Sequence, residues 1–279
     1  MEKICWANSD FNSSDVVIVG IPDESRSHSL REGTSMAPDR IRRISNLRDS
    51  YKRLDQVSKG FPYDRISKNI CDFGNIAREQ ISQTFQKIID SKKVPITVGG
   101  DHSITPSIIR SMSKKFENIS FVYFDAHPDF VTSTTNYYGS VFGDVLPYIK
   151  KSSSIQIGTR TPELEELDNL REHQIAVITP YEIEKKGISE ISNQILETVG
   201  NNIYVSFDMD CIDPAHAPGV SVPVPLGLSG TQAQFLLKNL ARQGIIGMDL
   251  VEVCPPFDVD DRTSHLASRI ISEIISSMK

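Results

Sequence analysis

Short apolar runs alternate with longer amphipathic stretches along nearly the whole 279-residue chain. The runs contain many β-branched and aromatic residues, which is typical of strands that are covered by helices on both faces. They predict strands at residues 15–22, 94–98, 119–124, 154–157, 203–207 and 244–248. The amphipathic stretches predict helices at residues 77–91, 105–115, 161–172, 188–200, 229–243 and 262–278. This order predicts an α/β fold, a three-layer α/β/α sandwich around a mainly parallel sheet.

Composition and charge limit the class of protein. Residues 1–279 contain no internal repeat, low-complexity tract or linker, so we expect a single domain. The net charge is −6, and the lysines and arginines do not gather into the basic stripe that is typical of nucleic-acid binding. No segment approaches the roughly 20 apolar residues of a membrane helix, residues 1–10 do not resemble a secretory signal, and the four cysteines form no CxxC pair. We therefore expect a soluble cytoplasmic protein with no nucleic-acid or membrane partner.

Residues of metal-binding type follow three of the predicted strands. Ligands of parallel sheets bind beyond the carboxyl ends of the strands, so residues that directly follow a strand are candidates for a functional site. The residues are His102 after strand 94–98, then Asp125, His127 and Asp129 after strand 119–124, and Asp208 and Asp210 after strand 203–207. In extended backbone, residues two positions apart point to the same side. We therefore expect the residues of each segment to project together.

The chemistry of these six side chains predicts a metal site. Neighbouring carboxylates repel each other unless a cation lies between them. Two imidazoles and four carboxylates suit Mn²⁺ better than a metal that prefers thiolates. Six ligands around one ion would leave no place for water, whereas two ions that share them keep open positions and provide hydroxide near neutral pH. Any one of the segments could be a turn, a helix cap or a solvated histidine, but three at separate strand ends predict a dinuclear centre.

Three segments resemble the signature blocks of the arginase/agmatinase (ureohydrolase) family. They are GGDHS at 99–103, DAHPD at 125–129 and SFDMDCIDP at 206–214. Further similar segments lie at 20–22, 31–33, 37–42, 72–75, 157–160, 217–219, 223–228, 249–253 and 255–256, so the resemblance covers most of the chain. It implies an arginase-like fold, assembly into trimers or hexamers, and two Mn²⁺ ions per subunit. The implied ligands are His102, Asp125, His127, Asp129, Asp208 and Asp210.

The resemblance also implies an activity, the hydrolysis of a linear guanidine. Asp129 would accept a proton and pass it towards the leaving amine. Glu252 matches the family carboxylate that pairs with the guanidinium, which it would orient through two hydrogen bonds. The expected reaction is that of an agmatinase, agmatine and water to putrescine and urea, a step of polyamine biosynthesis.

The chain departs from the family pattern at three places. One is the run VPLG at 224–227, where the family prefers a more polar sequence with Gly-Gly. The family usually carries a histidine, thought to assist proton transfer, shortly after the DAHxD block, but Tyr138 stands there in this chain and joins the predicted substrate-binding residues. A phenol is a poor proton shuttle near pH 7, so His28 and His216 are candidate substitutes. Val131 replaces an asparagine that helps arginases to hold the α-carboxylate of arginine. An apolar residue there favours agmatine, which has no such group.

Other functions stay open at this stage. Within the family they are hydrolysis of guanidinobutyrate, guanidinopropionate, arginine or formiminoglutamate. An acidic substrate would call for a nearby arginine, for which Arg160 and Arg26 are candidates. A deacetylase-type zinc hydrolase would need one metal and fewer carboxylates. A non-catalytic, metal-binding paralogue is the alternative from another class.

Overall fold

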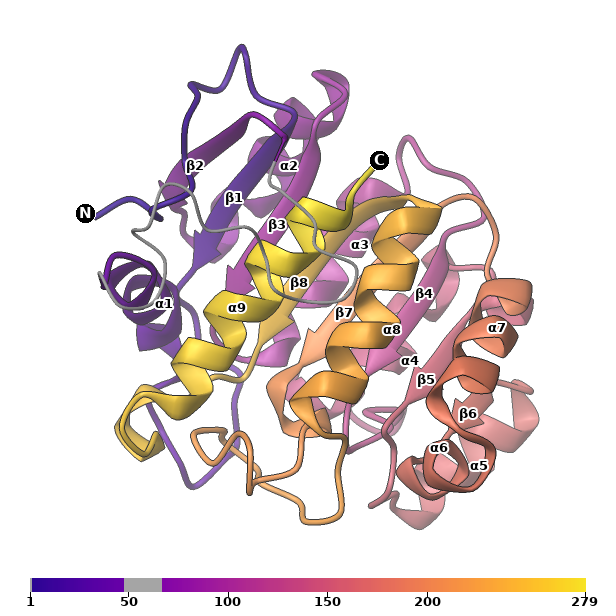
Figure 1. Cartoon of the computed structure of the whole chain (residues 1–279). Helices are drawn as coiled ribbons and strands as arrows, with labels where there is room; N and C mark the ends of the chain where they lie inside the picture. The colour runs from indigo at the N-terminus through magenta and orange to yellow at the C-terminus, as the bar shows by residue number, and fades with distance from the viewer. Residues whose placement is uncertain (1, 48–66) are drawn as a thin grey trace.

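The computed structural model describes residues 2–47 and 67–279. Within them, eight strands form one sheet. The strands are β1 (Val16–Ile21), β2 (Ile70–Asn75), β3 (Val94–Gly99), β4 (Ser120–Phe124), β5 (Ile155–Ile157), β6 (Ala176–Ile178), β7 (Ile203–Asp208) and β8 (Ile245–Val251). Their order across the sheet is β2-β1-β3-β8-β7-β4-β5-β6, and every pairing between them is parallel. Figure 1 shows the strands running side by side with the same direction.

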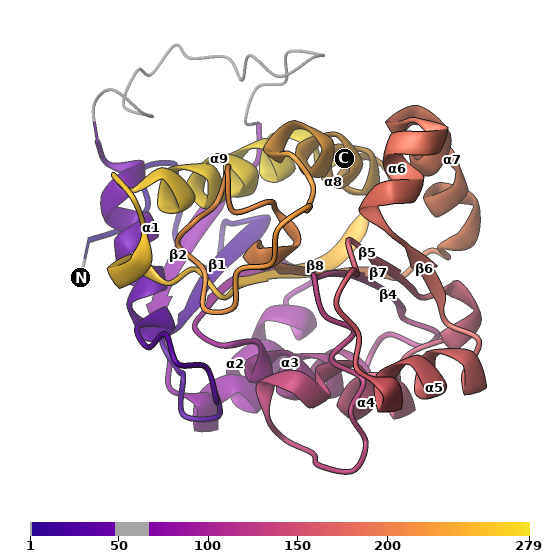
Figure 2. The same cartoon turned by 90° about the horizontal axis from the view of Figure 1, so that it is seen from below.

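Helices cover both faces of this sheet, as Figure 2 shows from below. One layer contains α1 (Ala37–Ser45), α6 (Pro180–Lys186), α7 (Ile188–Thr198), α8 (Gly230–Gln243) and α9 (Arg262–Ser277). The other contains α2 (Ile81–Asp90), α3 (Thr105–Met112), α4 (Val141–Val145) and α5 (Leu164–Glu172). The predicted three-layer α/β/α sandwich is confirmed. No helix in the described part of the chain is long and apolar enough to cross a membrane.

Alternate residues of each strand build two separate cores. Val16 and Ile18 of β1 pack with the first helical layer, whereas Val17 and Val19 pack with the second. Because both faces are buried, the strands are apolar at nearly every position, which is the pattern that made them visible in the sequence. β2 and β6 were not among the strands that this alternation predicted. β2 is interrupted by the buried Asp72, and β6 is only three residues long with Ala176 exposed.

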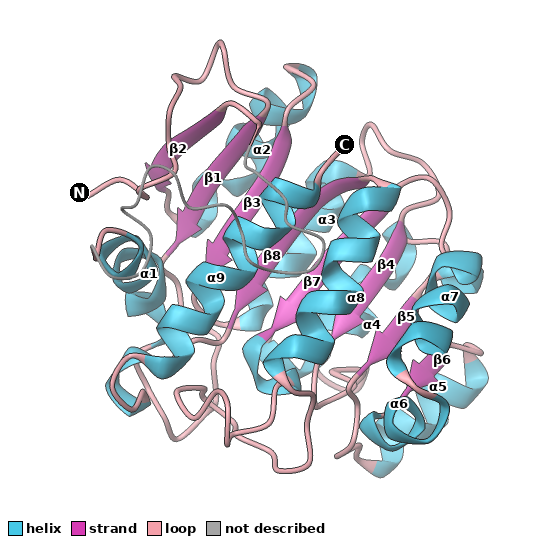
Figure 3. Cartoon of the chain, in the orientation of Figure 1, coloured by secondary structure: helices cyan, strands magenta, loops and turns pink. Residues whose placement is uncertain are grey.

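The carboxyl ends of the strands meet at one edge of the sheet, towards which the arrowheads point at the bottom of Figure 3. β3, β8, β7 and β4 are the four central strands. Three of them precede the segments that carry the predicted metal ligands, and the fourth, β8, precedes Glu252. The predicted strand at 244–248 extends to Val251, which places Glu252 directly after its end.

Candidate metal centre

Polar residues from distant parts of the chain meet at the ends of the central strands. His102 follows β3, Glu252 follows β8, Asp208 ends β7, and Asp125 follows β4. His102 and Glu252 are 150 positions apart, yet the backbone N–H of His102 donates to Glu252 Oε1 at 2.7 Å. The parallel sheet therefore assembles the site by bringing equivalent strand ends together.

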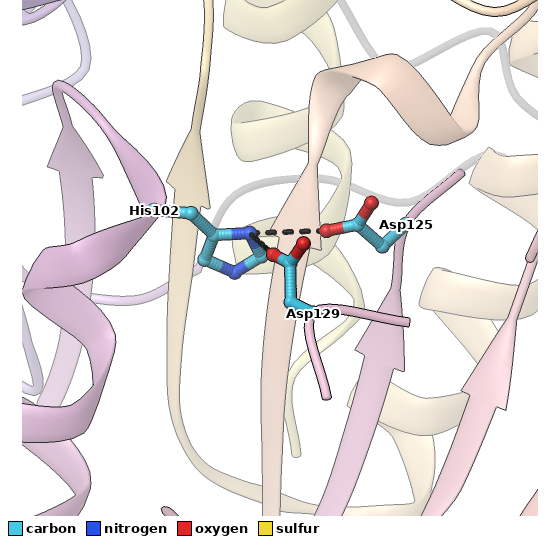
Figure 4. A group of neighbouring side chains, drawn as sticks. All are labelled: His102, Asp125 and Asp129. Carbon is cyan, nitrogen blue, oxygen red and sulfur yellow. Dashed lines mark ion pairs between the residues drawn. The ribbon is translucent and has the colours of Figure 1, made fainter. Parts of the chain in front are cut away.

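Nδ1 of His102 faces three carboxylates. It lies 3.1 Å from Asp125 Oδ2, 3.2 Å from Asp208 Oδ2 and 3.5 Å from Asp129 Oδ2. Figure 4 shows the ring of His102 pointing towards Asp125 and Asp129. All four side chains are buried. His102, Asp125 and Asp129 thus form one group whose ligand atoms all lie within 4.8 Å of one another.

A second group lies beside the first and shares Asp125 with it. Nδ1 of His127 is 3.0 Å from Asp210 Oδ2 and 3.3 Å from Asp125 Oδ1. His127, Asp125 and Asp210 also have ligand atoms within 4.8 Å of one another. The His127 side chain is 24% exposed, so the cluster is reached from solvent on this side. The two groups and Asp208 bring together all six residues that the sequence predicted as ligands.

The cluster carries more negative charge than its own side chains balance. Burial, with the charges of Asp210 and Asp125, raises the pKa of Asp208 well above its usual value. Burial, with the charge of Asp125, also raises the pKa of Asp129. Burial lowers the pKa of His102, but the carboxylates of Asp125 and Asp208 outweigh it and hold this pKa well above 6.5. The pKa values of Asp208, Asp129 and His102 are therefore shifted in the directions expected for a site that lacks positive charge.

One oxygen of Asp125 also indicates that positive charge is missing from the cluster. Asp125 Oδ2 is buried and has no hydrogen-bond partner among the described residues. A buried polar atom without a partner calls for an explanation, and a divalent cation between the two groups would provide one. The donor atoms are imidazole nitrogens and carboxylate oxygens, a set that suits Mn²⁺. The residues present therefore fit a metal centre.

The backbone that presents these ligands differs from the predicted extended conformation. Asp129 lies beyond β4 with φ 46°, and Asp210 lies in a short 3₁₀ turn after β7. The prediction that a period of two aligns the ligands was wrong, because the chain turns as soon as each strand ends. Asp125 Oδ1 accepts the N–H of His127 at 2.7 Å, and Asp208 Oδ1 accepts that of Asp210 at 2.7 Å. These turns bring the side chains together.

Glu252 lies at the border of the cluster, buried and in a left-handed conformation with φ 65°. Its Oε1 accepts the His102 N–H, and its Oε2 accepts the Ser221 hydroxyl. Burial, with the charge of Asp101, raises the pKa of Glu252 to about 8. A carboxylate oxygen has two acceptor positions, so each oxygen of Glu252 can accept one more hydrogen bond.

Tyr138 belongs to an aromatic group near the centre. Its ring centroid lies 5.8 Å from that of Tyr137 and 6.0 Å from that of His28, and His28 stacks on Tyr137 at 5.3 Å. Burial, with the charges of Asp129 and Glu252, raises the pKa of the Tyr138 phenol. The half-buried phenol is thus within electrostatic reach of both carboxylates.

The other histidine and arginine candidates from the sequence differ in their surroundings. His216 is exposed and lines a cavity beside the start of α9, together with Arg262 and Arg269. Arg160 donates only to backbone carbonyls, among them those of Asp210 and Val224, so it fastens the loop after β7. Of the two histidines predicted as substitutes, only His28 lies against Tyr138.

Several residues at the centre were missed by the sequence analysis. The Tyr123 hydroxyl donates to Asp129 Oδ2 at 2.5 Å and lies 3.2 Å from His102 Nδ1. Ser206 Oγ is 2.8 Å from His102 Nε2 and donates to Asp249 Oδ1 at 2.7 Å. A tyrosine or an aspartate inside an otherwise apolar strand must find a partner, and this signal could have identified Tyr123 and Asp249.

Comparisons with known proteins agree with the geometry. Residues 14–276 match the family model of the arginase family. An agmatinase of Neisseria meningitidis serogroup C is 33% identical to this chain, over 94% of the chain and 86% of that protein. A guanidinobutyrase of Pseudomonas aeruginosa is 31% identical, over 96% of the chain and 87% of that protein. The crystal structure of an agmatine ureohydrolase of Thermoplasma volcanium superposes with a TM-score of 0.87 at 28% identity, covering 99% of this chain and 94% of the other.

Proposed function

The chain belongs to the arginase family, and from this premise we propose that it hydrolyses agmatine to putrescine and urea at a dinuclear manganese centre. The observation that carries the proposal is the cluster of buried carboxylates and imidazoles with too little positive charge of its own. Family membership further supports three parts of the proposal. These are a single domain over residues 1–279, a homo-oligomer and a cytoplasmic location.

Six residues would hold the two ions. They are His102, Asp125, His127, Asp129, Asp208 and Asp210. Asp125 would serve both ions, since one of its oxygens faces each histidine. When bound, a pair of divalent cations lowers the pKa of water enough to provide a nucleophile near neutral pH.

The remaining tasks fall to side chains whose free atoms suit them. Tyr123 occupies Asp129 Oδ2, which leaves Asp129 Oδ1 to accept a proton and pass it to the leaving nitrogen. Glu252 has one free acceptor position on each oxygen, and a planar guanidinium can donate to both at once. Such a pairing orients the guanidinium carbon towards the centre.

The aromatic group suits the cationic tail of agmatine. Tyr137, Tyr138 and His28 offer ring faces beside the centre, and a ring face attracts an ammonium group. Val131, two residues after Asp129, offers no hydrogen bond from its side chain to an amino-acid head. The proposed substrate-binding residues are therefore Glu252 and Tyr138.

Guanidinobutyrate is the second candidate substrate, and Arg26 favours it. The Arg26 backbone bonds Asp101 Oδ2 and the N–H of Tyr138, which places this residue beside the aromatic group. Its half-buried side chain makes no hydrogen bond or ion pair with a described residue. An arginine without a partner could pair with the carboxylate of guanidinobutyrate.

Urea release from Mn²⁺-loaded protein tests the proposal. Agmatine, guanidinobutyrate and arginine should be compared side by side, with Asp129→Asn as the inactive control. We expect urea from agmatine and a loss of about 100-fold or more in the variant. Urea from guanidinobutyrate alone would replace the substrate and not the reaction class. Metal binding without urea from any of the three would contradict the proposal and favour formiminoglutamate or a non-catalytic role.

A further inference from the structure

A row of polar side chains crosses the buried sheet beneath the candidate centre. In register across neighbouring strands stand Thr97, Asp249, Ser206, Tyr123 and Gln156. All five are fully buried, in strands that are otherwise mostly apolar. Three of them touch the segments that form the centre. Ser206 contacts His102, Tyr123 contacts Asp129, and Gln156 donates to the Pro128 carbonyl at 2.8 Å.

Asp249 is the member of this row that receives the most hydrogen bonds. Ser206 Oγ donates to its Oδ1 at 2.7 Å. The Tyr204 hydroxyl and Thr105 Oγ1 donate to its Oδ2 at 2.8 and 3.0 Å. A carboxylate accepts and a hydroxyl has only one hydrogen to give. The hydrogen of Ser206 is therefore committed to Asp249.

This commitment decides the direction of the next hydrogen bond. Ser206 Oγ, with its hydrogen directed to Asp249, can only accept from His102 Nε2, which lies 2.8 Å away. In a neutral imidazole only one ring nitrogen carries hydrogen. If Nε2 carries it, the lone pair of Nδ1 faces Asp125 and Asp208, where a metal ion would be held.

We propose that Asp249, acting through Ser206, is a positioning residue that keeps His102 in the form whose Nδ1 binds metal. The inference rests on the proposed function, because it needs a metal at the centre. His127 provides a contrast. Its Nδ1 faces Asp125 and Asp210, but no side chain of the described residues bonds its Nε2. The effect of Asp249 is therefore confined to the ion on the His102 side.

The chain offers a matched pair of variants for the test. Ser206→Ala removes the hydroxyl that accepts from His102. Thr97→Val removes another buried hydroxyl of the same row, but Thr97 Oγ1 has no hydrogen-bond partner among the described residues. Both changes are small, and circular dichroism with thermal unfolding of the metal-free proteins checks that each is folded. Mn²⁺ binding is followed by electron paramagnetic resonance of the free ion, so no substrate is required.

Removal of an outer partner of a metal-binding histidine lowers metal affinity by about 10- to 100-fold. We expect this loss for Ser206→Ala, at one of the two ions only, and unchanged affinity for Thr97→Val. Asp249→Ala completes a double-mutant cycle with Ser206→Ala. The double variant should bind Mn²⁺ with the same affinity as the single variant that has the lower affinity, because both changes break the same chain of hydrogen bonds to His102.

Three results would overturn the inference without contradicting the proposed function. Wild-type affinity in Ser206→Ala would do so alone, as would an equal loss in Thr97→Val or additive losses in the cycle. Wild-type protein that binds no Mn²⁺ would overturn the proposed function and this inference with it. The wild-type measurement therefore distinguishes the two failures.

Discussion

Replacement of Glu252 by glutamine tests whether this carboxylate binds the guanidinium. Glutamine has nearly the same shape, and its side-chain oxygen can still accept the His102 N–H that bonds Glu252 Oε1. Its NH₂ group would then face Ser221, whose hydroxyl can rotate from donating to accepting. The surroundings of residue 252 are therefore preserved, and the charge that faces the substrate is removed.

The size of the effect follows from the hydrogen bonds that are lost. The oxygen of the glutamine side chain keeps one acceptor position. The NH₂ group of the same side chain cannot accept a hydrogen bond, and it repels the N–H groups of a guanidinium. A hydrogen bond to a charged group contributes about 1.5–3 kcal/mol. The loss of one such bond lowers kcat/KM by about 10- to 150-fold, since each 1.4 kcal/mol corresponds to a factor of ten.

The assay is steady-state urea release from agmatine by Mn²⁺-loaded protein. Glu182→Gln is the matched control. One oxygen of Glu182, Oε2, accepts the Thr179 N–H at the start of α6, and glutamine can accept the same bond. The helix α6 follows β6, the edge strand of the sheet, and not one of the central strands that end at the centre. We expect the control to stay within about threefold of wild type. Activity of Glu252→Gln within the same range, with Mn²⁺ bound, would refute the assignment of Glu252 to the guanidinium.

Three further predictions concern metal, packing and thiols. Dialysis against a chelator should abolish activity. Mn²⁺ at about 100 times its dissociation constant should restore activity and add about 2.7 kcal/mol to the free energy of unfolding. A thermal midpoint that does not change when Mn²⁺ is added would contradict a bound ion. Arg42→Met should lower the free energy of urea unfolding by about 3–5 kcal/mol, because Arg42 is buried and its Nε and Nη2 both lie 2.9 Å from Asp72; a change below about 1 kcal/mol would be inconsistent with this pairing. Burial, with the charges of Glu252 and Glu24, raises the pKa of Cys254 to about 12, so its thiolate forms only as the pH approaches 12, and a disulfide reagent at pH 8 should label it only after unfolding.

The sequence predicted the fold well because burial on two faces leaves a strong pattern. Six strands were visible as apolar runs, and their order of alternation with helices was enough to predict a parallel sheet. β5 and β6 are equally short, but all three residues of β5 are buried, whereas β6 buries only Ile178. β6 therefore lacks the two-sided burial that makes a strand visible as an apolar run, and it was missed. Asp72 in β2 breaks the apolar run, and two partners that make its burial favourable, Arg42 and the N–H of Ile4, lie far away in the sequence.

The candidate site was predictable in its residues but not in its geometry. Strand exits rich in histidine and aspartate marked all six proposed ligands, and the structure brings them together. The 3₁₀ turn at Asp210 is capped by the side chain of Asp208, a local signal that the expectation of extended backbone did not use. Asp129 is left-handed, a conformation that aspartate tolerates but that the sequence does not require. The bonds of Tyr123 and Asp249 were also missed, since register across the sheet decides which side chains meet.

Glu252 bears on the choice between a catalyst and a protein that only binds metal. It is not among the six proposed ligands, and its bond to the His102 N–H uses one acceptor position of Oε1 only. Its left-handed backbone costs about 1–3 kcal/mol, and a buried carboxylate is unfavourable unless it is paired. In the part of the chain that the structure describes, no lysine or arginine forms an ion pair with it. A guanidinium substrate would supply the missing positive charge at the position where the fold holds this carboxylate, and a non-catalytic metal-binding paralogue would leave it uncompensated.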